Sequence, residues 1–179
     1  MVALCAIWGL QQVTVKATSS DVAPILQISI RSGAAALLVV ALMLARGERI
    51  ALGGEDLRPG LAVGGLFALE FLLVGEGLRR TTASHAVMFL YTAPIFAALG
   101  LHLRLPSERL RAVQWAGIAL ALVGIIVTFA GRGDAKAGAA APLGDLLTLG
   151  GGVAWGATTV AVRGSRLSEA PATRTLLYQ

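Results

Sequence analysis

Charged residues are scarce in this sequence: Asp, Glu, Lys and Arg make up 14% of its 179 residues, against about a quarter in a typical soluble domain. It has one cysteine, Cys5, and two widely separated histidines, His85 and His102. A single cysteine excludes an intramolecular disulfide, and neither histidine is accompanied by other ligands at a metal-binding spacing. We therefore expect no metal site, no cofactor and no disulfide scaffold.

Enzymatic motifs are also missing. The sequence has no phosphate-cradling glycine loop followed by Lys and Ser or Thr, and no nucleophile with a base at a useful spacing. The net charge of +5 comes from basic residues in short segments between apolar runs, without interleaved aromatic residues. These absences argue against an enzyme and against a nucleic-acid partner.

Long apolar runs are what the chain has in excess. Apolar residues make up 56% of the sequence, and the mean hydropathy is +0.75. A helix that crosses the lipid bilayer needs about 20 mostly apolar residues. Six runs predict an all-α, polytopic membrane helix bundle: Val2–Val15, which is short, Pro24–Leu44, Pro59–Leu78, Thr82–Leu103, Ala112–Gly131 and Leu143–Val162.

Lysine and arginine are distributed unevenly between the two sides of such a bundle. Eight lie on one side and five on the other, and positive residues are enriched in cytoplasmic loops. We therefore expect the N-terminus in the cytoplasm. The larger set is Arg46, Arg49, Arg58, Arg104, Arg109, Arg111, Arg163 and Arg166, and the smaller is Lys16, Arg79, Arg80, Arg132 and Lys136.

Small residues recur every four positions on two predicted spans. Such stripes let helix backbones approach closely in lipid. Close packing explains them, and lining a substrate path is the alternative. The stripes are Gly60, Gly64 and Ala68, and Gly144, Thr148, Gly152 and Gly156.

The sequence contains an internal repeat with an offset of 147 residues, in which Trp8, Gly9, Lys16 and Pro24 recur as Trp155, Gly156, Arg163 and Pro171. Five predicted spans separate the copies, and an odd number turns the second copy upside down in the membrane, as in secondary transporters. We expect residues 1–142 to form the first repeat, with its first span clipped, and residues 143–179 to begin an inverted second repeat. A complete protein would then have about ten spans, so we expect this chain to be incomplete.

Several of these elements resemble the EamA-like branch of the drug/metabolite transporter superfamily. The resemblance rests on Trp8-Gly9 with Lys16, Pro24 with Arg31, the segment Gly77–Ala98, Glu108-Arg109, Gln114 and Gly117. It implies a multi-pass permease of ten helices in the bacterial inner membrane. It also implies that the cargo is a small metabolite, often moved outward.

Polar side chains fall at similar depths on several predicted spans. Arg31, Glu70 and Tyr91 lie roughly 10–13 Å from the same end of their helices, and Gln11 and Gln12 lie nearer that end of theirs. Such groups rarely face lipid. Arg31 and Glu70 are expected either to pair, which is slightly favoured, or to line the substrate path, where Glu70 is also a candidate for proton coupling.

Two tryptophans related by the repeat, Trp8 and Trp155, fall near the middle of their spans, although tryptophan prefers the membrane interface. They either pack beside the glycine that follows each of them or flank a central cavity. Gln12 and its repeat mate Thr159 lie one turn further on and join them as candidates for the substrate path.

Three local features concern helix ends and bends. Pro94 lies in the middle of the fourth span and predicts a kink, because proline removes a helical hydrogen bond; it is the candidate hinge. Ser107 and Glu108 predict the N-terminal cap of the fifth span. Glu76 predicts an interfacial ion pair with the two arginines that follow at 79 and 80.

The sequence therefore predicts a secondary transporter of small metabolites that works by alternating access. Two alternatives stay open: a transport-inactive membrane fragment or assembly partner, and a small multidrug-type exporter that forms a homodimer around Glu70. The internal repeat argues against the exporter, because a chain built to dimerise needs no covalent second copy.

Overall fold

The computed structural model describes residues 2–18, 20–48, 50, 53–130 and 141–179, without the side chains at positions 4, 5, 8, 12 and 128–130. Regular structure in these residues is helical. The helices are α1 (Val2–Ala17), α2 (Pro24–Ala45), α3 (Leu57–Arg80), α4 (Ala83–Leu90), α5 (Ala93–Arg104), α6 (Ala112–Ala130), α7 (Ala141–Arg163) and α8 (Ala172–Tyr178). Short 3-10 turns are η1 (Gly54–Asp56), η2 (Pro106–Glu108) and η3 (Arg166–Ser168).

The predicted all-α, polytopic membrane bundle is confirmed. Three helical segments among the described residues are long and apolar enough to cross a membrane, namely Pro24–Ala45, Gly54–Arg80 and Ala83–Arg104, and Ala112–Val127 is a shorter apolar helix. α7 is not one of the three, although its 23 residues extend about 34 Å. It packs against α3, α4 and α5, and a helix that contacts protein needs less apolar surface than one that faces lipid. The count of six spans stays a prediction.

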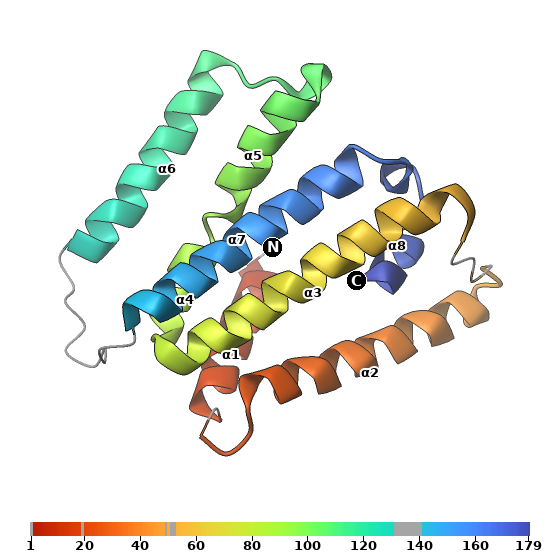
Figure 1. Cartoon of the computed structure of the whole chain (residues 1–179), viewed down its shortest axis with the longest axis horizontal. Coiled ribbons are helices and arrows are strands. Elements are labelled where there is room, and N and C mark those ends of the chain that lie inside the picture. The colour runs from red at the N-terminus through yellow and green to blue at the C-terminus, as the bar shows by residue number, and fades with distance from the viewer. Residues whose placement is uncertain (1, 19, 49, 51–52, 131–140) are drawn as a thin grey trace.

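α3 and α7 form the centre of the bundle and run antiparallel, side by side (Figure 1). Glycines hold them close. A Cβ added to Gly77 would lie 2.5 Å from Thr148 Cγ2, and one added to Gly144 would lie 2.8 Å from the backbone nitrogen of Thr81. A Cβ on Gly156 would lie 2.7 Å from Phe96 Cβ of α5. The packing interpretation of the α7 stripe is confirmed.

The other predicted stripe has a different neighbour. Gly60 and Gly64 face Tyr178 at the end of α8, whereas Ala68 is exposed. The small residues at 60 and 64 therefore make room for a short helix that lies against α3, and the stripe ends one turn earlier than the sequence predicted.

The fourth predicted span consists of two helices. α4 ends at Leu90 and α5 begins at Ala93, with Pro94 in the first turn of α5. Pro94 has no N–H to donate to the Leu90 carbonyl. Thr92 Oγ1 donates a hydrogen bond to the Phe89 carbonyl at 2.6 Å and so stabilises the break. The bend is confirmed as a full interruption of the helix, and its role as a hinge stays a prediction.

The predicted cap of the fifth span is wrong. Ser107 and Glu108 lie in η2, and α6 begins only at Ala112. Gln114 Oε1 accepts a hydrogen bond from the Arg111 backbone nitrogen at 2.8 Å, which satisfies one of the free N–H groups at a helix start. The extended backbone at Arg109 ends the 3-10 turn that begins at Pro106, so the helix starts later.

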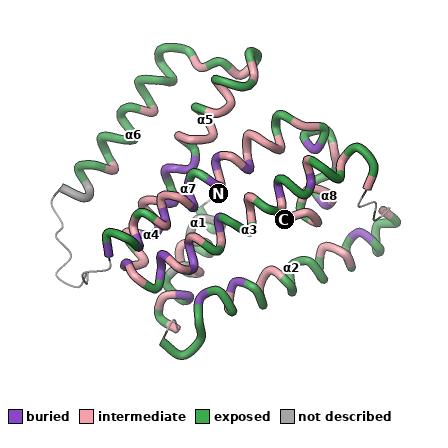
Figure 2. The backbone as a smooth tube through the Cα atoms, in the orientation of Figure 1, coloured by how far each residue is buried: buried purple, intermediate pink, exposed green. Residues whose placement is uncertain are grey.

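Burial is uneven along the bundle (Figure 2). The buried core cluster, Val15, Val74, Leu78, Ala86 and Leu90, lies where α3 ends and α7 begins; we call this the tight end. At the opposite end, which we call the open end, α3 begins and α7 finishes. Val63 and Leu167 are fully buried there, but cavities also lie between the helices. Most of the described side chains of α6 and of α2 are exposed, as suits apolar helices in lipid.

Candidate functional site

A cavity of about 560 Å³ lies among α1, α2, α3, α7 and α8. We call it the Glu70 cavity. Its volume is typical of small-molecule sites. It brings together five sequence-predicted residues, Gln11, Arg31, Glu70, Trp155 and Thr159. The other lining residues are Phe67, Phe71, Thr158, Val162, Arg163, Thr175 and Gln179.

Glu70 is the buried charge of this cavity. It lies in the second half of α3 and is 5% exposed. Its Oε2 atom is buried and has no hydrogen-bond partner among the described residues. A buried polar atom without a partner costs about 1–3 kcal/mol, and more if it is charged. The carboxylate is therefore available to accept from a group that enters the cavity.

Arg31 of α2 lines the same cavity. Its guanidinium carbon lies 4.5 Å from the centre of the Phe71 ring, within the range of a cation–π contact. In the described part of the chain no ion pair joins Arg31 to Glu70, so the direct pair that the sequence slightly favoured is absent. Two opposite charges share one cavity without contact.

α7 contributes the wall between this cavity and a second one of about 410 Å³. Trp155 and Thr159 line both cavities, and Trp155 also packs against the core cluster. One turn further, Arg163 Nη2 lies 2.7 Å from Glu108 Oε1. Arg163 lines the Glu70 cavity and Glu108 the second cavity. This ion pair therefore joins α7 to η2 where the two cavities adjoin.

Of the remaining predicted site residues, Tyr91 and Pro94 lie elsewhere. Tyr91 is 46% exposed at the α4–α5 break and does not line the Glu70 cavity. Pro94 lines the second cavity. The side chains of Trp8 and Gln12 are outside the described part of the structure. The substrate-path roles of all these residues stay predictions.

The tight end holds a polar cluster that the sequence did not reveal. Asp145 Oδ2 of α7 lies 3.1 Å from His85 Nδ1 of α4, and the Thr81 hydroxyl donates to the same carboxylate. The sequence surroundings of His85 suggested that it has no partner, and the structure shows that it has one. The two residues are 60 positions apart in the sequence. The one sequence feature that could have indicated this cluster is Asp145 itself, an acidic residue near the start of an apolar run.

The ends of α1 and α7 lie at opposite ends of the bundle. The Lys16 ammonium donates to the Leu78 carbonyl at the tight end, whereas Arg163 pairs with Glu108 at the open end. Close to Lys16 along α3, the predicted interfacial pairing of Glu76 is confirmed, at 3.0 Å to Arg79 and by a contact with Arg80. The two helices run in opposite directions, and the sequence repeat that relates them stays a prediction.

Comparison with known proteins identifies the family. The model of the EamA-like transporter family matches residues 1–130. This chain belongs to that family. YedA of Escherichia coli K12, an inner membrane transporter described as uncharacterized, is 31% identical to this EamA-like chain over 173 residues, which cover 93% of the chain and 52% of YedA. YedA of E. coli O157:H7 and of E. coli O6:H1 give the same values. No solved structure matches the chain.

The EamA-like chain spans about half the length of the curated relatives it matches. Its family and its apolar helices make it a membrane protein of the drug/metabolite transporter kind. The resemblance drawn from the tryptophan-glycine pair, Pro24 and the fourth-span segment is thereby confirmed.

Proposed function

We propose that this EamA-like chain is part of a secondary transporter that moves a small polar or amphipathic metabolite across a bacterial inner membrane by alternating access. One observation carries the proposal: Glu70 Oε2 is buried and unpartnered at a cavity large enough for a small metabolite. A substrate that donates a hydrogen bond, such as one with an ammonium or amide group, would satisfy this atom. The aromatic rings of Phe71 and Trp155 would contact its apolar part.

Alternating access needs one closed and one open end. Close glycine contacts occlude the tight end. The Glu70 cavity extends toward the other end, to Arg163, which is the last residue of α7, and to Gln179, which follows α8. With the N-terminus in the cytoplasm, as the distribution of Lys and Arg favours, the open end faces the cytoplasm. The structure would then correspond to an inward-facing state.

Proton coupling would use the same carboxylate. A Glu70 side chain that accepts a proton when the substrate leaves would avoid an unpaired buried charge, whose burial is costly. The proposal therefore includes exchange of substrate for a proton at Glu70. Arg31 would hold the anionic or carbonyl group of the substrate at the other wall of the cavity.

The test is a thermal-shift screen of the purified chain in detergent with small ammonium-bearing metabolites and the matching neutral amides. We expect some metabolites to raise the melting temperature of the wild type and not that of Glu70→Gln. The matched control is Glu76→Gln on the same helix, whose carboxylate pairs with Arg79 outside the cavity. An equal response of Glu70→Gln and wild type would contradict the site. Binding without uptake of the same metabolite by vesicles that contain the chain would favour the fragment or assembly-partner alternative.

A further inference from the structure

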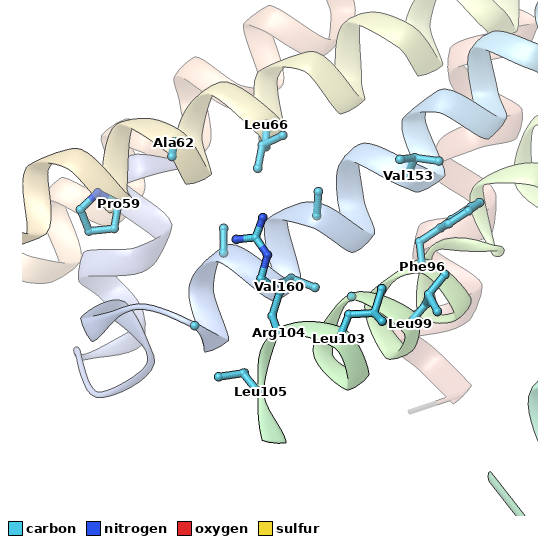
Figure 3. Close-up of a pocket in the computed structure, with 14 residues that line it drawn as sticks. Pro59, Ala62, Leu66, Phe96, Leu99, Leu103, Arg104, Leu105, Val153 and Val160 are labelled. Atoms are coloured by element: carbon cyan, nitrogen blue, oxygen red, sulfur yellow. The ribbon is translucent and has the colours of Figure 1, made fainter. Parts of the chain in front are cut away.

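A third and larger cavity lies at the open end, away from Glu70 (Figure 3). It has a volume of about 640 Å³ and lies among α3, α5 and α7. Its walls are apolar and include Leu66, Phe96, Leu103 and Val160. None of the residues that line the Glu70 cavity lines this one, so it is a separate site.

Arg104 is the single charged or polar side chain among the 14 lining residues. In Figure 3 its guanidinium points into the space between α3 and α7. No hydrogen bond or ion pair of this side chain is present in the part of the chain that the structure describes. One unpaired cation at the mouth of an apolar cavity fits a ligand with an anionic head and an apolar tail.

The depth of the cavity identifies the ligand further. Arg104 is the last residue of α5 and of the membrane-length segment Ala83–Arg104, so it lies at the level of the lipid headgroups. Phe96 lies eight residues deeper on the same helix, or about 12 Å. One leaflet of the hydrocarbon core is about 15 Å thick. The cavity therefore extends from headgroup level through most of one leaflet.

A water-soluble metabolite would fit this cavity poorly, because no second polar side chain lines it to bind a second polar group. An acyl chain needs no such partner. Basic pockets between membrane helices bind anionic lipid headgroups. We propose that the cavity among α3, α5 and α7 binds one anionic phospholipid, with its phosphate on Arg104 and an acyl chain along the apolar walls.

The site is independent of the proposed transport, and a direct binding measurement tests it. The full chain, purified in mild detergent, is mixed with phosphatidylglycerol or phosphatidylcholine of the same acyl chains, and bound lipid is counted by native mass spectrometry. We expect one phosphatidylglycerol to be retained in preference to phosphatidylcholine. Arg104→Gln should lower this preference about fivefold, as for one basic residue near a lipid surface. Arg104→Lys should keep most of it, and so should the control Arg111→Gln, an exposed arginine outside the cavity.

A second pair of variants tests the apolar walls. Ala62 lines the cavity and Ala68 does not, although both are exposed alanines of α3. Ala62→Phe should abolish retention of both lipids, whereas Ala68→Phe should not. Retention of phosphatidylglycerol by Arg104→Gln at the wild-type level would overturn the proposal. So would its displacement by millimolar inorganic phosphate, which would indicate a free-anion site, or unchanged retention by Ala62→Phe, which would indicate that another surface holds the lipid.

Discussion

Arg163 at the end of α7 and Glu108 in η2 form an ion pair of 2.7 Å, although 55 positions separate them in the sequence. The pair joins the central helix to the turn between α5 and α6, where the Glu70 cavity and the second cavity adjoin. Because both side chains are partly exposed, an interaction of this kind contributes little to stability. Its position suits it to control access to the cavities.

The first prediction concerns that ion pair. Glu108→Gln should change the free energy of unfolding by less than about 1 kcal/mol, yet it should speed the reaction of a cysteine at Thr159 with a membrane-impermeant thiol reagent. The assay requires Thr159→Cys in a Cys5→Ala background, so that the introduced thiol is the only one. Arg166→Gln, which removes the exposed pair with Glu55, is the control. Equal labelling rates in all variants would mean that the pair does not restrict access.

The second prediction concerns the charge in the cavity. Because Glu70 Oε2 is buried without a partner, Glu70→Gln should raise the free energy of unfolding by about 1 kcal/mol or more while it removes substrate binding. A double-mutant cycle with Arg31→Gln on thermal stability in detergent should give a coupling energy below about 1 kcal/mol, because the two groups do not touch. Strong coupling, with the double variant recovering the losses of the single ones, would restore the direct pair.

The third prediction concerns the glycines of α3. Gly77→Ala places a methyl group against Thr148 and the Gly144 carbonyl, so it should cost about 1–3 kcal/mol of stability, as overpacking does. Gly65→Ala on the same helix meets open space and should be neutral or slightly stabilising, because alanine favours helix. Melting temperatures in detergent compare the two. A similar change in both variants would show that contact with α7 does not determine the effect of Gly77→Ala on stability.

The fourth prediction concerns Pro94. Pro94→Ala supplies the missing N–H and allows α4 and α5 to join as one helix. We expect a longer distance between spin labels placed at the outer ends of the two helices if the present bend relaxes, or slower exchange between two distances if the break is a hinge. An unchanged, single distance distribution would show that the tertiary contacts of Thr92 and Gly152, not proline, set the break.

The fifth prediction concerns orientation. Reporter fusions inserted between residues 46 and 58 should report the cytoplasm, and those within residues 134–141 the exterior, because Lys and Arg are more numerous on the first side. Apart from Ala141, the second segment lies outside the described residues. The reverse result at both positions would make the open end periplasmic and the present state outward-facing.

The sequence was sufficient where the signal is local. Runs of apolar residues gave the positions of the helices, since each run must satisfy its backbone hydrogen bonds internally. Pro94 predicted the bend. The depths of Arg31 and Glu70 along their helices predicted that the two residues lie in one layer. These inferences need only the rise of a helix and the preferences of single residues.

Features that depend on how helices face each other were not predictable. Helical rise gives the depth of Tyr91 but not its direction, and its side chain is partly exposed and does not line the Glu70 cavity. Glu108 has the spacing of a helix cap, and only the tertiary structure brings Arg163 to it. Asp145 and His85 are separated by most of two spans and by two connecting segments, and no periodicity relates them.

The uneven packing of α3 and α7 also has a mechanical consequence. At one end the two backbones touch through glycines and a threonine, and at the other end cavities separate them. In such a pair, one helix can tilt relative to the other about the close contacts at the tight end, which act as the pivot. For a helix of 23 residues, a tilt of about 10° about the pivot moves the far end by roughly 6 Å. A displacement of that size is comparable to a whole side chain, so such a rotation would narrow the cavities while it leaves the glycine contacts at the tight end nearly intact.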